Sequence, residues 1–121
     1  MNLVGKIQHY AATLKADFVA SLELLADDIM WINLLPENVT FGGTYNGKEE
    51  VVAYFLQMAE TFEIGDYEWD KFEYIESGNT LVMVGFEKDG KALPTGKIFD
   101  LHFVWVVKFN DAGQICYLRE H

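Results

Sequence analysis

Hydrophobic positions near the start of the chain recur every three or four residues, which is the spacing of an amphipathic helix. Leu3, Ile7, Tyr10, Leu14 and Phe18 form one apolar stripe of this kind. A surface helix with such a stripe packs it against the rest of the fold. We therefore expect the ring of Tyr10 to enter the protein interior.

Shorter patterns follow this stripe. Asp17 is suited to cap a second, short helix, which we expect to extend through Ala26. The apolar run 29–35 then predicts a strand. After a loop rich in glycine and asparagine, a third helix is predicted over residues 48–62, with Phe55 on its apolar face.

The second half of the chain changes to the two-residue period of β-strands. Aromatic positions alternate with acidic ones but shift parity between Trp69 and Phe72, which predicts a β-bulge. Asp89-Gly90 predicts a hairpin turn. The remaining strands are predicted at residues 81–87, 97–109 and 114–120. The resulting order, α-α-β-α-β-β-β-β, is typical of an α+β fold with a mainly antiparallel sheet.

Composition narrows the class of protein. The 121 residues suit one domain, residues 1–121, and half of them are hydrophobic, which is ample for a packed core. A net charge of -10 opposes binding to nucleic acids and to anionic membrane surfaces. The start of the chain lacks a signal-peptide pattern, and no apolar run approaches the roughly 20 residues that span a bilayer. We expect a cytoplasmic protein.

No metal or cofactor is expected. The three histidines, His9, His102 and His121, show no spacing typical of metal ligands. The chain also lacks a glycine-rich phosphate loop and a nucleophile elbow.

Four segments, taken in order, resemble the nuclear-transport-factor-2-like superfamily, above all its polyketide-cyclase-like and ketosteroid-isomerase-like branches. These segments are residues 24–31, 43–51, 95–100 and 109–120. The resemblance implies a cystatin-like α+β cone, in which a bent, mainly antiparallel sheet wraps around three helices. It also implies a mostly apolar cavity on the concave face and an outer face that forms a homodimer. Because this scaffold carries many unrelated activities, the fold alone does not give the function.

The steroid isomerase mechanism can be tested residue by residue. That enzyme uses an aspartate base and an oxyanion hole made of a tyrosine and a protonated aspartic acid. By position, the resemblance places the tyrosine at Tyr10, the base at Asn33 and the second acid at Trp105. Asn33 cannot act as a carboxylate base, and Trp105 offers only an indole N–H. Steroid isomerase activity is therefore not expected.

Three other side chains are candidates for acid–base work. Tyr10 is either a core tyrosine bonded to a backbone carbonyl or a donor that lines the pocket. His102 shares a strand face with Asp100, which can orient an imidazole. Trp105 has the opposite parity, however, so His102 faces outward if Trp105 lines the cavity.

Glu120 shares strand parity with Leu118 and would face the cone together with it. A carboxylate in an apolar cavity has a raised pKa and can serve as an acid or a base. The alternative is a salt bridge or a solvated strand end.

Two functions of different classes remain open. The first is a binding protein without turnover, with a hydrophobic pocket for a small apolar carbonyl or phenolic ligand. The second is an isomerase, cyclase or dehydratase acting on a small apolar carbonyl compound, in which Tyr10 donates and Glu120 or His102 takes the proton. The residues expected to line the pocket are Tyr10, Trp31, Asn33, Phe55, Trp105, Leu118 and Glu120.

The strand predicted over residues 97–109 is apolar on both faces. Phe103, Trp105 and Val107 share one parity, and Val104 and Val106 share the other. A strand that is apolar on both sides is expected to be buried on both sides. Since helices cover only the concave side, we expect a homodimer through the outer sheet face.

Overall fold

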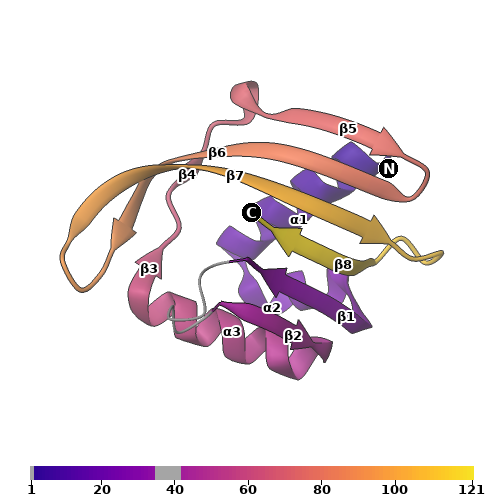
Figure 1. Cartoon of the computed structure of the whole chain (residues 1–121), viewed down its shortest axis with the longest axis horizontal. Helices are drawn as coiled ribbons and strands as arrows, with labels where there is room; N and C mark the ends of the chain where they lie inside the picture. Colours follow the sequence, from indigo (N-terminus) through magenta and orange to yellow (C-terminus); the bar gives the residue numbers. More distant parts are fainter. Residues whose placement is uncertain (1, 35–41) are drawn as a thin grey trace.

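A computed structural model describes residues 2–34 and 42–121 of the chain. In these residues three helices, α1, α2 and α3, and two short 3-10 turns, η1 and η2, accompany a curved sheet (Figure 1). The helical elements are α1 (Leu3–Ala16), α2 (Phe18–Ser21), η1 (Leu22–Leu24), α3 (Gly47–Thr61) and η2 (Trp69–Lys71). The fold is the α+β cone that the sequence predicts.

Eight strands form one sheet in this part of the chain, ordered β2-β1-β8-β7-β6-β3, with β4 and β5 also paired to β6. The strands are β1 (Leu25–Asn33), β2 (Gly43–Asn46), β3 (Phe62–Glu63), β4 (Asp66–Tyr67), β5 (Glu73–Ser77), β6 (Thr80–Ala92), β7 (Lys97–Phe109) and β8 (Ile115–Glu120). Only β1 and β8 pair in parallel among the described strands. In Figure 1 the sheet curves from β5 at the top to β2 at the bottom, where α3 lies beside it.

Polar side chains begin the first two helices. Asn2 Oδ1 accepts a hydrogen bond of 2.7 Å from the backbone N–H of Gly5. Asp17 Oδ1 accepts one of 3.1 Å from Ala20, which confirms Asp17 as the cap of the second helix. The predicted stripe of α1 is buried at Ile7, Tyr10 and Leu14, together with Ala11.

The second helix is shorter than predicted. It gives way to η1 and then to β1, so Ala26 is a strand residue and not a helical one. The parallel pairing of Leu25 with Ile115 of β8 draws this segment into the sheet. At the other end β1 stops at Asn33, and Leu35 of the predicted strand lies outside the described residues.

Two further predictions are wrong in detail. The parity shift between Trp69 and Phe72 is the 3-10 turn η2, which replaces the expected bulge. Asp89-Gly90 is not a hairpin turn, because β6 continues through it and the chain turns at residues 93–96. Asp89 takes a φ of 60° within a bulge of β6, where the register with β7 shifts between Glu87 and Gly90.

The long strand β7 separates the two faces of the sheet. Phe103, Trp105 and Val107 are buried on the concave side against the helices, and Val104 and Val106 are half-buried on the other side. Opposite Phe103 stands Gly85 of β6, where an added Cβ would overlap the Phe103 ring. The absence of a side chain at Gly85 lets this ring lie across β6 on the concave face of the sheet.

Candidate functional site

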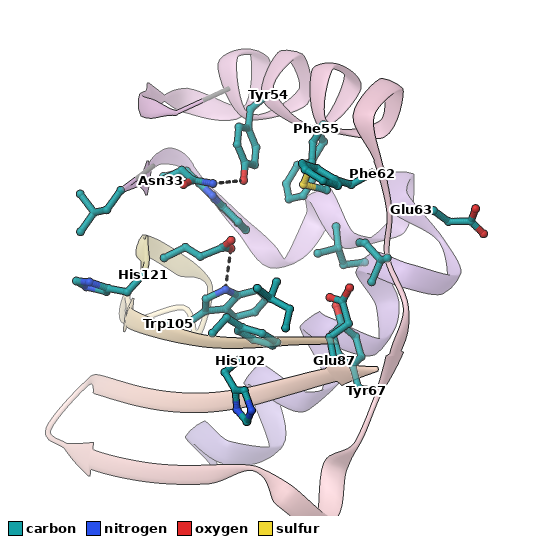
Figure 2. Close-up of a pocket in the computed structure, with 18 of the residues that line it drawn as sticks. Asn33, Tyr54, Phe55, Phe62, Glu63, Tyr67, Glu87, His102, Trp105 and His121 are labelled. Atoms are coloured by element: carbon teal, nitrogen blue, oxygen red, sulfur yellow. Dashed lines mark hydrogen bonds between the residues drawn. The ribbon is translucent and has the colours of Figure 1, made fainter. Parts of the chain in front are cut away.

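A cavity of about 470 Å³ lies between α3 and the concave face of the sheet (Figure 2). Aromatic rings from several elements contribute much of its wall. These rings are Trp31, Tyr54, Phe55, Phe62, Tyr67, Phe99, Phe103 and Trp105. Such a wall favours an apolar occupant.

Glu120 brings a carboxylate to this cavity from the last strand. Antiparallel pairing places Glu120 opposite Trp105, and the indole Nε1 donates a hydrogen bond of 2.9 Å to Glu120 Oε2. Burial raises the pKa of Glu120; the Trp105 hydrogen bond opposes this effect, and the nearby charge of Glu87 adds to it. A proton on Glu120 is therefore held more readily than on an exposed carboxylate.

Glu87 is a second carboxylate in the cavity, and the sequence analysis missed it. It stands on β6 just before the bulge and is only 8% exposed. Its Oε2 accepts a hydrogen bond of 3.0 Å from the backbone N–H of Gly65, and burial raises its pKa. Figure 2 shows the Glu87 carboxylate beside Tyr67 and turned into the space. A signal was present, because Glu87 shares strand parity with the buried Leu81 and Met83.

Asn33 and Tyr54 form a buried polar pair at the α3 side of the cavity. Asn33 Nδ2 donates a hydrogen bond of 2.8 Å to the hydroxyl oxygen of Tyr54. Burial raises the pKa of Tyr54, and the negative charge of Glu120 adds to this effect. Both hydroxyl and amide are therefore neutral polar groups at physiological pH.

Tyr10 lies beneath the cavity and not among the residues that line it. Its ring packs between Trp31 and Trp105, with centroid separations of 6.3 and 6.2 Å. The hydroxyl is fully buried and makes no hydrogen bond within the described residues. Burial raises the pKa of Tyr10 well above its ordinary value, and Glu120 acts on it in the same direction.

His102 and Asp100 do not form a pair directed into the cone. His102 borders the cavity, but its ring packs against Phe86, its cross-strand partner, at a centroid distance of 4.5 Å. Figure 2 shows the imidazole turned away from the Trp105 side chain. Asp100 Oδ1 instead accepts a hydrogen bond from the backbone N–H of Asp89.

The structure thus brings five of the predicted pocket residues to one cavity and leaves two behind it. Leu118, like Tyr10, is fully buried in the core and does not line the space. The five that line it are Trp31, Asn33, Phe55, Trp105 and Glu120. Of the three candidates for acid–base work, only Glu120 offers its functional group to the cavity.

The described residues contain no group of three His, Cys, Asp or Glu side chains placed to hold a metal ion. Within residues 2–34 and 42–121, no helix is long and apolar enough to cross a membrane.

The chain is similar to proteins of one family over nearly its whole length. The sequence profile of the SnoaL-like domain matches residues 7–118. An NTF2-like protein of unknown function from Burkholderia pseudomallei is 26% identical, with a TM-score of 0.77 over 98% of this chain and 88% of that one. No protein of curated function matches the chain.

Two other solved structures share the fold at lower identity. A candidate SnoaL-like polyketide cyclase from Mesorhizobium loti is 18% identical, with a TM-score of 0.73 over 100% of this chain and 99% of that one. TerC, co-crystallised with polyporic acid, is 19% identical, with a TM-score of 0.78 over 98% of this chain and 88% of that one.

Proposed function

Because this chain belongs to the SnoaL-like domain family, we propose that its cone binds a small, flat, apolar molecule that carries a phenolic or carbonyl group. The observation that supports this function is the aromatic cavity of about 470 Å³. Pockets for small organic molecules generally occupy about 300–1,000 Å³ and combine apolar walls with a few fixed polar groups.

The polar groups of the cavity favour a phenol over a ketone. A phenolic hydroxyl can donate to the carboxylate of Glu120, which faces the space. A carbonyl oxygen needs a donor, and the indole N–H of Trp105 already donates to Glu120. TerC, a protein of the same fold, was co-crystallised with polyporic acid, which agrees with an organic ligand for this scaffold.

Steroid isomerisation is not part of this proposal. The position that corresponds to the isomerase base is Asn33, whose amide bonds the Tyr54 hydroxyl and cannot abstract a proton. The carboxylates of Glu120 and Glu87, which line the cavity, come from β8 and β6 instead.

An acid–base enzyme is the second candidate, and the raised pKa of Glu120 favours it. A buried carboxylate with this property can take a proton from a carbon acid next to a carbonyl group. In such an enzyme Tyr10 and His102 would not contact the substrate directly. Tyr10 lies below the cavity wall, and the His102 ring packs on Phe86.

Binding of naphthol tests the proposed function. Trp31 and Trp105 line the cavity, whereas Trp69 is 37% exposed, so a Trp69→Phe background makes tryptophan fluorescence report on the cavity. We expect saturable quenching by naphthol. Leu101→Phe should weaken it, because Leu101 lines the cavity and a larger ring takes up part of the space.

Leu93→Phe provides the matched control for this experiment. Leu93 lies on the same hairpin and is 41% exposed, as Leu101 is, but it does not line the cavity. Equal loss of binding in both variants, or no binding by the native protein, would contradict the proposed function.

A further inference from the structure

Glu87 and Glu120 both line the cavity. Burial raises the pKa of Tyr67 and of Glu120, and the negative charge of Glu87 adds to both shifts. Each carboxylate keeps one hydrogen bond from the protein, Glu87 from the Gly65 N–H and Glu120 from the Trp105 N–H. Both carboxylates are therefore held in place, and each can still accept further hydrogen bonds from a ligand.

The described lining of the cavity contains two histidines, His102 and His121, but neither lysine nor arginine. Burial raises the pKa of Glu87, and the charge of Lys15 acts against this effect. Lys15 donates its hydrogen bonds to the Gly65 carbonyl oxygen and the Asp66 carboxylate, each at 2.7 Å. His121 Nε2 accepts from Arg119 Nε at 3.0 Å. Glu87 and Glu120 thus line one space whose described wall carries no lysine or arginine.

Aromatic rings surround the carboxylates on several sides. The Trp31 ring meets the Phe55 ring at 5.1 Å and the Trp105 ring at 6.1 Å, both at steep angles. The Phe103 ring lies 5.4 Å from the Trp105 ring, on the same face of β7. Rings set at steep angles around a space offer their negative faces and form an aromatic cage, which attracts organic cations.

The two carboxylates and the aromatic rings line the same cavity, and both features favour a positively charged ligand. We propose that the cavity selects an organic ammonium ion with a flat apolar body, whose charged nitrogen lies between Glu120 and Glu87 within the aromatic cage. The proposal rests on the proposed function, since it names the charge class of the ligand that the same cavity binds.

The opposite charge is disfavoured for two independent reasons. An anionic ligand would place a third negative charge beside Glu87 and Glu120, at a site where burial reduces screening by solvent. The net charge of -10 also repels anions and attracts cations at longer range. A cationic ligand, by contrast, supplies the partner that a buried carboxylate needs.

Three probes with the same apolar body test this inference: naphthylmethylamine, naphthylmethanol and naphthoate. Titration calorimetry with the native protein should show the ammonium compound binding about tenfold more tightly than the neutral alcohol. The carboxylate compound should bind more weakly than the alcohol. If the alcohol binds and the ammonium compound binds no more tightly, the inference is wrong but the proposed function stands. If none of the three binds, both fail.

Variants show where the selectivity arises. Glu120→Gln and Glu87→Gln should each lower ammonium affinity about tenfold and change alcohol affinity by less than about threefold. Glu63→Gln is the matched control, since Glu63 borders the cavity but its side chain points away from it in Figure 2. A preference for the ammonium compound that survives in both cavity variants would overturn the inference and assign the preference to overall charge.

Discussion

At Glu120, burial and hydrogen bonding act on the pKa in opposite directions, and burial is the larger effect. The folded protein therefore holds the Glu120 proton to a higher pH than the unfolded chain, whose value is near 4.5. Stability consequently falls as pH rises from about 4.5 through the folded pKa, and the penalty is complete above that pKa. Glu87 contributes with the same sign, since burial also raises its pKa.

Replacement of Glu120 by glutamine removes this penalty. We expect Glu120→Gln to raise the free energy of unfolding at neutral pH and to flatten its dependence on pH, because the amide cannot ionise but still accepts from the Trp105 N–H. Chemical unfolding at a series of pH values measures both effects. An unchanged pH dependence, with Glu63→Gln as the control, would show that burial does not raise the pKa of Glu120.

Tyr10 and Tyr54 differ in the hydrogen bonding of their buried hydroxyls. The Tyr10 hydroxyl is buried without a partner among the described residues, whereas the Tyr54 hydroxyl accepts from Asn33. We expect Tyr10→Phe to leave stability unchanged or to raise it by up to about 1 kcal/mol, and Tyr54→Phe to lower it by about 1–2 kcal/mol. Thermal unfolding distinguishes the two.

The same variants decide whether Tyr10 contributes to ligand binding. Because its hydroxyl lies behind the cavity wall, we expect naphthol affinity to stay within about twofold in Tyr10→Phe. A loss of about 1 kcal/mol or more would instead show that the hydroxyl reaches the bound ligand.

Among the elements, the pairing of β6 with β7 sets the shape of the cavity wall. Gly85 on β6 leaves room for the Phe103 ring, which an added Cβ would overlap. We expect Gly85→Ala to lower stability by about 1–3 kcal/mol, because the ring has to move within a packed core. Chemical unfolding measures the change.

A double variant provides the control for Gly85. Phe103→Leu removes the ring that the new methyl group meets, so Gly85→Ala should cost less in that background. If the two changes are additive, the close approach of Gly85 and Phe103 does not govern the packing of this wall.

Sequence patterns predict these elements where one signal dominates. The buried stripe of α1 and the apolar parity of β7 at Phe103, Trp105 and Val107 both match the structure, because each continues over many residues. The pair Asp89-Gly90 misleads, since a residue with positive φ suits a bulge as well as a hairpin turn. The continued pairing of β6 with β7 decides between them, and that pairing is not local.

The same distinction between local sequence patterns and non-local pairing applies to the residues of the cavity. Strand parity relates Trp105 and Glu120 to the concave face, so their arrival at one cavity follows from local pattern. Glu87 was missed although it shares strand parity with Leu81 and Met83, because an acidic residue at the end of a predicted strand is ordinarily assigned to the solvent side. Its position depends on Gly65 and on the bulge, which bring two distant segments together.

For the whole molecule, the outer face of the sheet predicts a homodimer. Val104 and Val106 lie on this face, half-buried, while Met30 is 39% and Ile75 is 68% exposed. Monomers seldom expose continuous apolar patches. Sedimentation equilibrium at micromolar concentration should give about twice the chain mass of 13.8 kDa.

A charge on this face tests the dimer. Val106→Lys should yield a folded monomer, because a lysine cannot be buried without a partner. Leu93→Lys is the control, since Leu93 lies at the hairpin end and away from the outer face of β7. A native protein that sediments as a monomer would refute the prediction.

The cavity as the ligand site is the central claim, and a crystal structure with naphthol tests it most directly. The account predicts electron density for the bicyclic ring inside the cavity, in contact with Trp31, Phe55 and Trp105, with the hydroxyl directed at Glu120. Density only on the outer sheet face, or a cavity that stays empty at saturating naphthol, would contradict it.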